Sequence, residues 1–380
     1  MALGIDFVGT NLGSGTKTYN INFCNQLNKT HITENIKVFI CKHYLSQIDL
    51  IINKNNKVQY IIKSDLLSIT LLRLLWMQFV LPFELKLLGI KKFYSPMNFS
   101  PILAKLLNIK IVLCLHSNLP WIYFNMMPGS KIRNFITKKL MEISIYNSDL
   151  LIVDSFFAKK EISKNLNLKK KKIKVVYLNI SNNFFSTKFN KKSIVCFNYN
   201  TKYILSVISC VKYHNIINLL AAFKLLIKEI NLSIKLVLVL QILDRKYFSE
   251  VKEYIKNNFD RGKILIYINL DSDKLPKLYS FAQVYVFTSY CEVFGLTTLE
   301  AMSQNTPVVI SNRSALPEIN GKAAQYFDPD NIEEIKNSIK KVIVNQKLKN
   351  KLIRNGKEWL KNFYSENNVK KTIDIIQSLR

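Results

Sequence analysis

Short apolar runs alternate with helix-length segments along most of this sequence, and that alternation constrains the fold more than any other feature. The runs are continuously apolar, as strands are when both faces of a parallel sheet are covered. Parallel strands need crossovers between them, so the pattern predicts an α/β fold with helices on both faces of each sheet. We expect strands at Leu3–Val8, Ile36–Cys41, Ile109–Leu115, Leu150–Asp154, Ile173–Tyr177, Ile204–Ile208, Ile234–Leu240, Lys263–Tyr267, Val284–Thr288 and Pro307–Ser311, and helices at Thr18–Asn28, Leu219–Ile230, Tyr247–Phe259 and Leu296–Ser303, among others.

The alternation is interrupted in a polar stretch, residues 181–200, that is rich in Asn, Ser and Lys. A chain of 380 residues is long for one domain and ample for two. We therefore expect two Rossmann-like halves, residues 1–182 and 200–358, with the polar stretch as their linker. The remainder of the chain is predicted to be helical.

The formal net charge of the chain is +29. Such a charge suits an anionic partner, whether nucleic acid, an acidic membrane or a phosphorylated substrate. A general bias toward Lys, Asn and Ile would produce the same excess, and these residues abound throughout. Nucleic-acid binding would need basic residues interleaved with aromatic ones on one face, and because no such pattern stands out, we expect no nucleic-acid partner.

Six cysteines and four histidines are scattered along the chain, and no two cysteines form a Cys-x-x-Cys pair. Most of the cysteines lie among apolar residues, which predicts buried thiols in a reducing compartment rather than disulfides or a zinc site. An Asp-x-Asp pattern occurs at Asp271–Asp273, where we expect it to cap the following helix. No metal cofactor is expected.

Leu66–Leu88 is the most hydrophobic stretch of the sequence. Arg73, Glu84 and Lys86 interrupt it, so no uncharged run reaches the ~18 to 20 residues that a membrane span needs. We expect an amphipathic or buried helix that is broken at Pro82. No basic segment precedes the first apolar run, as one would in a signal peptide, so the expected location is cytoplasmic.

The most informative region covers residues 289–329 and follows an expected strand. It begins S-Y-C-E-V-F-G-L-T-T-L-E-A-M-S. Gly295 permits a close backbone approach, and the helix that starts at Leu296 turns its first N–H groups toward a ligand above the end of the strand. Phosphate at that helix N-terminus, with sugar hydroxyls on Glu292 and Glu300, would suit a sugar nucleotide.

This region resembles family 4 of the retaining glycosyltransferases. Their signature of two glutamates separated by seven residues is present as Glu292 and Glu300, and F-G-L-T-x-L-E-A-M, P-V-V-x-S and A-L-P-E-x-x-G-x-A-A-x-x-F-D-P follow in order. Weaker likeness to the bacterial polysaccharide and O-antigen branch continues at R-L-L-W-M-Q from Arg73. The resemblance implies the GT-B fold, in which an acceptor domain and a nucleotide-sugar domain face each other across a cleft and a last helix, residues 359–380, returns to the first domain.

The resemblance also implies roles for individual residues. Glu292 would hold the hydroxyls of the donor sugar at the reacting centre, and Glu300 would take the ribose hydroxyls. Thr297 and Thr298 would lie beside the phosphates. The backbone N–H groups that meet the sugar or the distal phosphate would be those of Phe294, Gly295 and Leu296.

Two positions in the first half complete the predicted site. Gly15 belongs to a Gly-x-Gly turn after the first strand, where backbone N–H groups would approach a diphosphate or the acceptor, although the turn fits neither the Walker A nor the G-x-G-x-x-G pattern. His116 follows the strand Ile109–Leu115 and, by resemblance, would bond the donor sugar. The alternatives are an ordinary turn at Gly15 and a packed cleft residue at His116.

One part of the family pattern is absent. Family members usually carry Arg and then Lys just after the first strand of the second domain, where the two cations neutralise the leaving diphosphate. Ser209 and His214 stand there instead, and Lys212 is expected to replace part of the charge. Losing an oriented cation at a developing charge costs several kcal/mol. A catalytically weak or inactive relative that binds sugar nucleotide or glycan is therefore the alternative function.

The expected activity is transfer of a mannose- or glucose-like hexose from a UDP- or GDP-linked donor to a glycan or lipid-linked acceptor, in cell-surface polysaccharide synthesis and without a metal. By resemblance the anomeric configuration is retained through same-face attack assisted by the departing phosphate, after closure excludes water. The basic composition and the hydrophobic stretch Leu66–Leu88 further predict that the protein contacts an anionic membrane, at the cytoplasmic face of the inner membrane.

Overall fold

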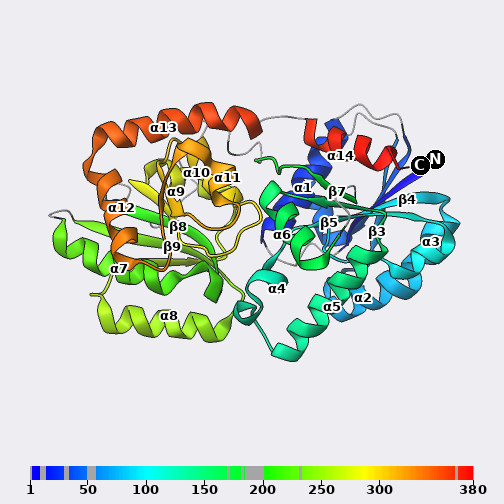
Figure 1. Ribbon diagram of the computed structural model, residues 1–380, viewed down its shortest axis with the longest axis horizontal. Coiled ribbons are helices and arrows are strands. Elements are labelled where there is room, and N and C mark those ends of the chain that lie inside the picture. Colours follow the sequence, from blue (N-terminus) through cyan, green and yellow to red (C-terminus); the bar gives the residue numbers. More distant parts are fainter. Residues whose placement is uncertain are drawn as a thin grey trace. The chain divides into compact units, whose positions relative to one another are not determined.

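The computed structural model describes residues 2–8, 14–29, 34–48, 57–168, 172–180, 184, 201–230, 233–363 and 367–379. The chain divides into two compact units, each with its own sheet (Figure 1). The first comprises Met1–Trp121, Phe135–Asn179 and Ser365–Arg380, and the second comprises Ile122–Asn134 and Ile180–Tyr364. The expected linker lies outside the described residues apart from Phe184, and Trp359, expected at the start of the returning helix, belongs to the second unit.

Seven parallel strands form the sheet of the first unit, in the order β3-β2-β1-β4-β5-β6-β7. The strands are β1 (Ala2–Phe7), β2 (Ile36–Cys41), β3 (Val58–Lys63), β4 (Ile90–Ser95), β5 (Lys110–Leu115), β6 (Leu150–Val153) and β7 (Ile173–Val175). The accompanying helices are α1 (Ser14–Lys29), α2 (Thr70–Leu75), α3 (Leu81–Leu87), α4 (Leu119–Ile122), α5 (Lys131–Asn147), α6 (Phe156–Leu166) and α14 (Asn367–Gln377). Helix α14 packs on α1, and Lys92 Nζ donates to the carbonyl oxygen of Gln377 at 2.6 Å.

Six parallel strands form the sheet of the second unit, in the order β10-β9-β8-β11-β12-β13. The strands are β8 (Lys202–Cys210), β9 (Ile234–Ile242), β10 (Ile264–Ile268), β11 (Val284–Phe287), β12 (Val308–Ser311) and β13 (Ala324–Phe327). Its helices are α7 (Ile216–Glu229), α8 (Arg245–Asn258), α9 (Leu275–Phe281), α10 (Leu296–Ser303), α11 (Leu316–Asn320), α12 (Ile332–Val344) and α13 (Gln346–Leu360). Helix α10 contacts α9 and α13, while α7 contacts α8 and α12, and the two groups lie on opposite sides of the sheet in Figure 1.

Every expected strand is present, with each end within two residues of its predicted place. Three strands were not predicted. β3 and β13 lie at the edges of their sheets, and both are only partly buried, so their sequences lack a continuous apolar run. β4 lies inside its sheet but begins Ile-Lys-Lys, and these two lysines, which are not buried, interrupt its apolar run.

The predicted break at Pro82 is wrong, because one continuous helical segment runs through α2, the π turn Trp76–Val80 and α3. Proline lacks an N–H and its ring would clash with the carbonyl four residues earlier, that of Gln78. In the π turn the N–H of Leu81 instead donates to the carbonyl of Trp76, five residues back. The wider turn lets the helix pass Pro82.

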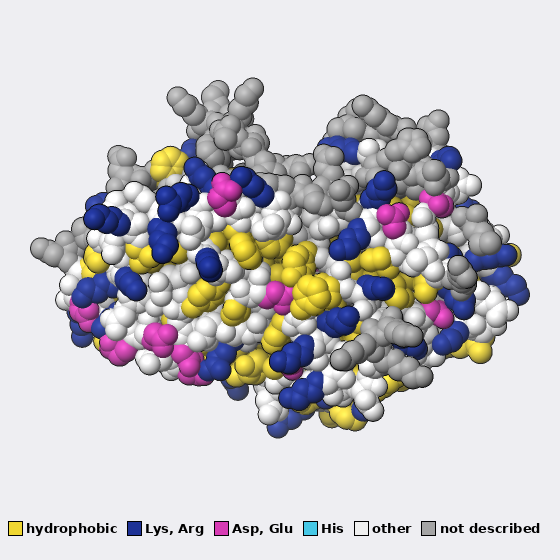
Figure 2. Space-filling model, turned by 45° about the horizontal axis from the view of Figure 1, so that its top comes forward, with side chains coloured by type: hydrophobic (Ala, Val, Ile, Leu, Met, Phe, Trp, Pro, Cys, Tyr) yellow, Lys and Arg dark blue, Asp and Glu magenta, His cyan; other side chains and the backbone are white. Residues whose placement is uncertain are grey.

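The burial predicted for the cysteines is confirmed for the five in the described part of the chain, all of which are buried free thiols, while Cys196 lies outside it. Lys and Arg side chains are spread across the face drawn in Figure 2 rather than gathered into one patch. Among the described helices, none combines the length and the apolar character needed to cross a bilayer.

Candidate functional site

The strand order of the second sheet reverses between β8 and β11, and open α/β sheets bind ligands beyond the carboxyl ends of strands at such a point. After β8 the chain makes one 3₁₀ turn, Lys212–His214, and Asn215 takes a φ of 56° to enter α7. After β11 a loop leads into α10. Thr288 Oγ1 in that loop donates to the carbonyl oxygen of His214 at 2.7 Å. The two loops are thereby held together at the switch point.

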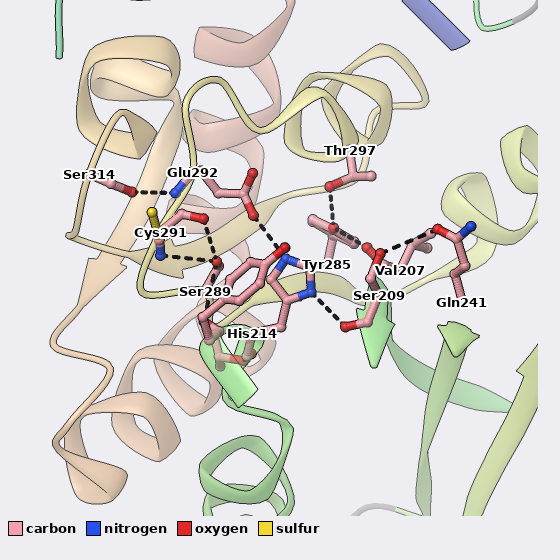
Figure 3. Close-up of polar contacts among 12 residues, drawn as sticks. Val207, Ser209, His214, Gln241, Tyr285, Ser289, Cys291, Glu292, Thr297 and Ser314 are labelled. Atoms are coloured by element: carbon pink, nitrogen blue, oxygen red, sulfur yellow. Dashed lines mark hydrogen bonds and ion pairs between the residues drawn. The ribbon is translucent and has the colours of Figure 1, made fainter. Parts of the chain in front are cut away.

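Glu292 and His214 face each other across these loops (Figure 3). Nε2 of His214 lies 3.0 Å from Oε1 of Glu292, and Nδ1 lies 2.6 Å from the carbonyl oxygen of Ser209. The two side chains are 9% and 18% exposed. The imidazole therefore bridges the end of β8 and the loop that precedes α10.

The hydrogen bonds fix where protons must sit on this pair. A carbonyl oxygen can only accept, so Nδ1 of His214 carries a hydrogen. The bond at Nε2 then requires a second proton, either on Nε2 or on the carboxyl group of Glu292. The pair thus holds one proton more than a neutral imidazole beside a carboxylate would.

The main chain of Glu292 is held by the loop between β12 and α11. Its N–H donates to Ser314 Oγ at 2.8 Å, and its carbonyl oxygen accepts from the N–H of Ala315 at 3.2 Å. Ser314 takes a φ of 55°, which turns the chain back at this point. Glu292 is therefore positioned by backbone contacts as well as by His214.

Gly295 is the N-cap of α10, and its backbone conformation requires a glycine. Its φ is 89°, and a Cβ atom here would lie 2.7 Å from Leu316 Cδ2. Leu296 and Thr297 follow in the first turn of α10, where backbone N–H groups have no partner within the helix. These groups and the helix dipole make the loop end of α10 suitable for a phosphate.

The hydroxyls of the first turn of α10 have structural partners. Thr298 is fully buried, and its Oγ1 donates to the carbonyl oxygen of Gly295 at 2.8 Å. Thr297 Oγ1 lies 2.8 Å from the hydroxyl oxygen of Tyr285, which reaches up from β11 (Figure 3). Phe294 is buried at 1% exposure, so only its backbone suits the predicted role.

Glu300 lies one turn into α10 and is buried. The hydroxyl of Tyr279 donates to its Oε2 at 3.1 Å. Burial raises the pKa of Glu300 to about 7, although the bond from Tyr279 opposes the shift. The carboxyl group predicted to take ribose hydroxyls is therefore held in place but titrates near neutrality.

Lys212 and His214 differ in what they contact. The ammonium of Lys212 is half exposed and lies 3.8 Å from Glu250 Oε1 on α8. His214, regarded in the sequence only as a departure from the family pattern, is the residue that meets Glu292. Ser209 contributes its carbonyl oxygen to His214, and its hydroxyl lies 3.5 Å from Gln241 Oε1.

His116 belongs to the first unit and directly follows β5. Its Nδ1 lies 2.8 Å from Asp154 Oδ2 after β6, and its backbone N–H donates to Asn98 Oδ1 at 2.7 Å. Burial opposes the charged imidazole, but Asp154, with Cys114, outweighs it and raises the pKa of His116 well above its usual range. Nε2 is buried and has no hydrogen-bond partner among the described residues, and its contact with a donor sugar stays a prediction.

The remaining predicted positions are less informative. Gly15 lies in the first turn of α1, and the other glycine of the turn, Gly13, lies outside the described residues. The cap predicted at Asp271–Asp273 is wrong, because no side chain caps α9 and Asp271 instead pairs with Lys274 at 2.8 Å. Lys274 itself is the N-cap, and Pro276 in the first turn has no N–H that a cap would satisfy.

Two groups in the described part of the chain bring possible metal-binding atoms within 4.8 Å of one another. They are Cys114 with His116 and Asp154, and Cys41 with His43 and Asp65. In each group the imidazole already bonds the aspartate, at 2.8 Å and 2.5 Å respectively. Neither arrangement is a tetrahedral set of four ligands.

Several positions were not predicted as parts of the site. In the second unit, Tyr279 and Tyr285 carry no motif of their own, and their hydroxyls reach α10 once the strands are ordered. In the first unit, the pairing of β5 with β6 brings Asp154 to His116. The signal for His214 was present, since it occupies the place of the expected lysine.

Comparison with known proteins agrees with this geometry. Residues 187–359 match the family described as glycosyl transferases group 1. The O-antigen chain mannosyltransferase RfbU of Salmonella typhimurium is 25% identical over 57% of this chain and 57% of its own length. O-antigen chain mannosyltransferase B of Escherichia coli is 28% identical over 66% of each chain. The match therefore spans less than two thirds of the length of either mannosyltransferase.

Solved structures share the whole fold. Sucrose-phosphate synthase from Thermosynechococcus elongatus has a TM-score of 0.75 at 16% identity, over 100% of this chain and 99% of its own. Anabaena HepE in complex with UDP and glucose has a TM-score of 0.73 at 14% identity, over 100% and 99% of the two chains. Identities this low show the fold alone.

Two Rossmann-like parallel sheets, with a Gly-capped helix and a glutamate at the switch point of the second, define the GT-B fold. Within that fold, the second unit of this chain is similar to the glycosyl transferases group 1, and both mannosyltransferases named above belong to bacterial O-antigen synthesis.

Proposed function

We propose that this protein is an active enzyme that transfers a hexose from a nucleotide-diphosphate sugar, bound by the second unit, to a glycan or lipid-linked acceptor. The observation that carries the proposal is the His214–Glu292 pair beside the N-terminus of α10. The carboxylate of Glu292 suits sugar hydroxyls, and the N-terminus of α10 suits phosphate. The names of the O-antigen relatives support a mannose-like sugar and a role in cell-surface polysaccharide synthesis.

Neutralisation of the leaving diphosphate falls to the first turn of α10 and the extra proton of the His214–Glu292 pair, with no metal. This proton takes the place of the lysine charge expected there. Oε1 of Glu292 is engaged by His214, so the carboxylate is better suited to hold donor hydroxyls than to attack the sugar. That engagement supports retention through attack on the same face, assisted by the departing phosphate.

We further propose that the enzyme works in the cytoplasm at the cytoplasmic face of the inner membrane, where a lipid-linked acceptor would be found. The names of the O-antigen relatives and the net charge of +29 support that location.

A thermal-shift screen of the whole chain against UDP- and GDP-linked glucose and mannose tests the donor site. One nucleotide is expected to raise the melting temperature, and Glu292→Gln to weaken that donor about tenfold or more, because a charged hydrogen-bonding group is lost. Glu358→Gln removes an exposed carboxylate on α13 and serves as the matched control. If no donor at millimolar concentration shifts the melting temperature, the donor site is wrongly assigned.

Two further variants test His214. His214→Ala is expected to weaken donor binding, whereas His214→Lys restores the expected cation and recovers it. Released sugar is then measured with the donor that binds, and its configuration is read by NMR before mutarotation. A donor that binds without release to water or to an acceptor extract would favour the non-catalytic alternative, for which Ser209 in place of a cation is the supporting observation.

A further inference from the structure

The helical segment of residues 70–87 in the first unit is apolar on two faces. Trp76, Met77, Leu81 and Leu85 are at most 7% exposed and form its inner face. Along its outer side runs a second row of apolar residues, here called the apolar stripe, whose members are 48% to 87% exposed. The apolar stripe consists of Leu71, Leu75, Phe79, Phe83 and Leu87.

The π turn keeps the apolar stripe on one side of the helix. Five residues spaced by four would wind about 160° around a regular α-helix of about 100° per residue. One π turn accommodates about one additional residue, which reduces this drift to about 60°. The turn at Trp76–Val80 lies in the middle of the stripe, between Leu75 and Phe83. The feature that carries the helix past Pro82 therefore also aligns the exposed side chains.

Neighbouring segments extend the apolar surface. Leu66 and Ile69, just before α2, are 64% and 54% exposed, and Leu72 and Val80 flank the stripe. The 3₁₀ helix Ile102–Leu107 packs against α3 and adds Leu106, which is 78% exposed. Single exposed apolar residues are ordinary, but a contiguous group of this size marks an interaction surface.

The charges around the apolar stripe indicate its partner. Residues 57–110 contain eight Lys or Arg and two acidic residues. Both acidic residues are paired, Asp65 with His43 and Glu84 with Lys63 at 2.7 Å. The lysines nearest the stripe in sequence or by packing are exposed, and they are Lys86, Lys91 and Lys105. A second copy would bring like charges together, whereas an anionic surface complements them.

We propose that the apolar stripe and its lysine rim bind the surface of an anionic lipid bilayer, with the helix lying in the interface rather than crossing it. This inference deepens the proposed function, and rests on it only for the idea that the acceptor is lipid-linked. A helix with large apolar side chains on its outer face and lysines beside them is suited to bury that face at the headgroup boundary. The surface belongs wholly to the first unit, while the donor site belongs to the second.

Co-sedimentation of the whole chain with vesicles tests the proposal, using phosphatidylcholine alone and phosphatidylcholine with phosphatidylglycerol. The wild type is expected to bind the anionic vesicles at least tenfold more tightly. Phe79→Ser with Phe83→Ser should reduce that binding about tenfold to hundredfold, because two large apolar side chains no longer enter the interface. The control pair Leu243→Ser with Val344→Ser changes exposed apolar residues of the second unit and should bind like the wild type.

Melting temperature and the donor-induced shift are measured on each variant. A folded stripe variant that keeps its donor shift but loses the vesicles supports the bilayer surface. Equal binding by the stripe and control variants would overturn it. So would a wild type that forms dimers by light scattering, ignores the vesicles and becomes monomeric in the stripe variant. Vesicle binding without any donor shift would instead count against the proposed function and leave the surface standing.

Discussion

Stability and ligand binding favour opposite protonation states of Glu300: burial favours the neutral carboxyl group, and ribose hydroxyls would favour the carboxylate. Its pKa in the folded chain is about 7, against 4.5 for an ordinary glutamate, because the carboxyl group is buried. The folded chain therefore binds more protons than the unfolded chain between these values. Its stabilising contribution is complete below about pH 4.5 and is lost as pH rises through about 7, by about 3 kcal/mol in total. As pH rises through this range, the chain comes to hold a buried carboxylate with one hydroxyl partner, that of Tyr279.

Glu300→Gln is expected to increase stability at pH 8 by up to about 3 kcal/mol, because the neutral amide avoids burying a charge. The gain should shrink toward zero near pH 4.5. Urea unfolding of variant and wild type at several pH values measures the difference, with Glu358→Gln as an exposed control. The same variant should bind donor more weakly if ribose hydroxyls bond the carboxylate. A variant less stable than the wild type at pH 8 would show that the carboxylate is needed by the fold.

His214 and Lys212 show that spacing in the sequence cannot decide which of two neighbouring side chains meets Glu292. A 3₁₀ turn has three residues per turn, so residues two apart point in different directions. In the turn Lys212–His214 the histidine meets Glu292 and the lysine reaches Glu250. The sequence marked the place where a cation was expected, but only the backbone path of the turn decides which side chain occupies it.

At the scale of elements, the loop and helix from Glu292 to Ser303 join the local sequence to the chemistry. Gly295 has a φ of 89° and little room for a Cβ beside Leu316. Gly295→Ala is expected to destabilise the chain by about 1 to 3 kcal/mol and to weaken donor binding, because the N-terminus of α10 must move. Gly262→Ala is the matched control, since Gly262 has a φ of 82° with nothing within 4 Å of its Cβ position.

Comparison of the two glycine variants distinguishes the cost of a strained backbone from an effect on donor binding. Both carry the cost of a left-handed backbone, measured by urea unfolding, and only Gly295→Ala adds the contact with Leu316. The donor-induced thermal shift should fall in Gly295→Ala and persist in Gly262→Ala. An unchanged shift in Gly295→Ala would show that phosphate does not depend on the first turn of α10.

Elements were predictable where burial on both sheet faces left an apolar run, as in β8 and β9. The edge strand β13 was not predictable, because it reads Ala-Gln-Tyr-Phe and needs only part of its surface covered, whereas the edge strand β10 keeps an apolar run and was predicted. The motif similarly identified Glu292 and Glu300 from one contiguous region. Tyr279 and Tyr285 could not be assigned, because their hydroxyls reach α10 only once a sheet order is set.

At the scale of the whole molecule, each unit has its own parallel sheet and its own buried core. Because each unit is stabilised by its own core, the two can unfold at different temperatures. The residues that would bind donor lie in the second unit. Calorimetry of the whole chain is therefore expected to show two transitions. Gly295→Ala should lower one of them, which identifies the transition of the second unit.

A bound ligand raises only the transition of the part it binds. The nucleotide sugar should therefore raise the transition lowered by Gly295→Ala, and Glu292→Gln should abolish that shift. Anionic vesicles should act on the other transition, because the apolar stripe lies in the first unit. One transition that moves as a whole with either ligand would show that the two units unfold together. Two independent responses would mean that membrane and donor are bound by separately stable halves, so that each can be altered without loss of the other.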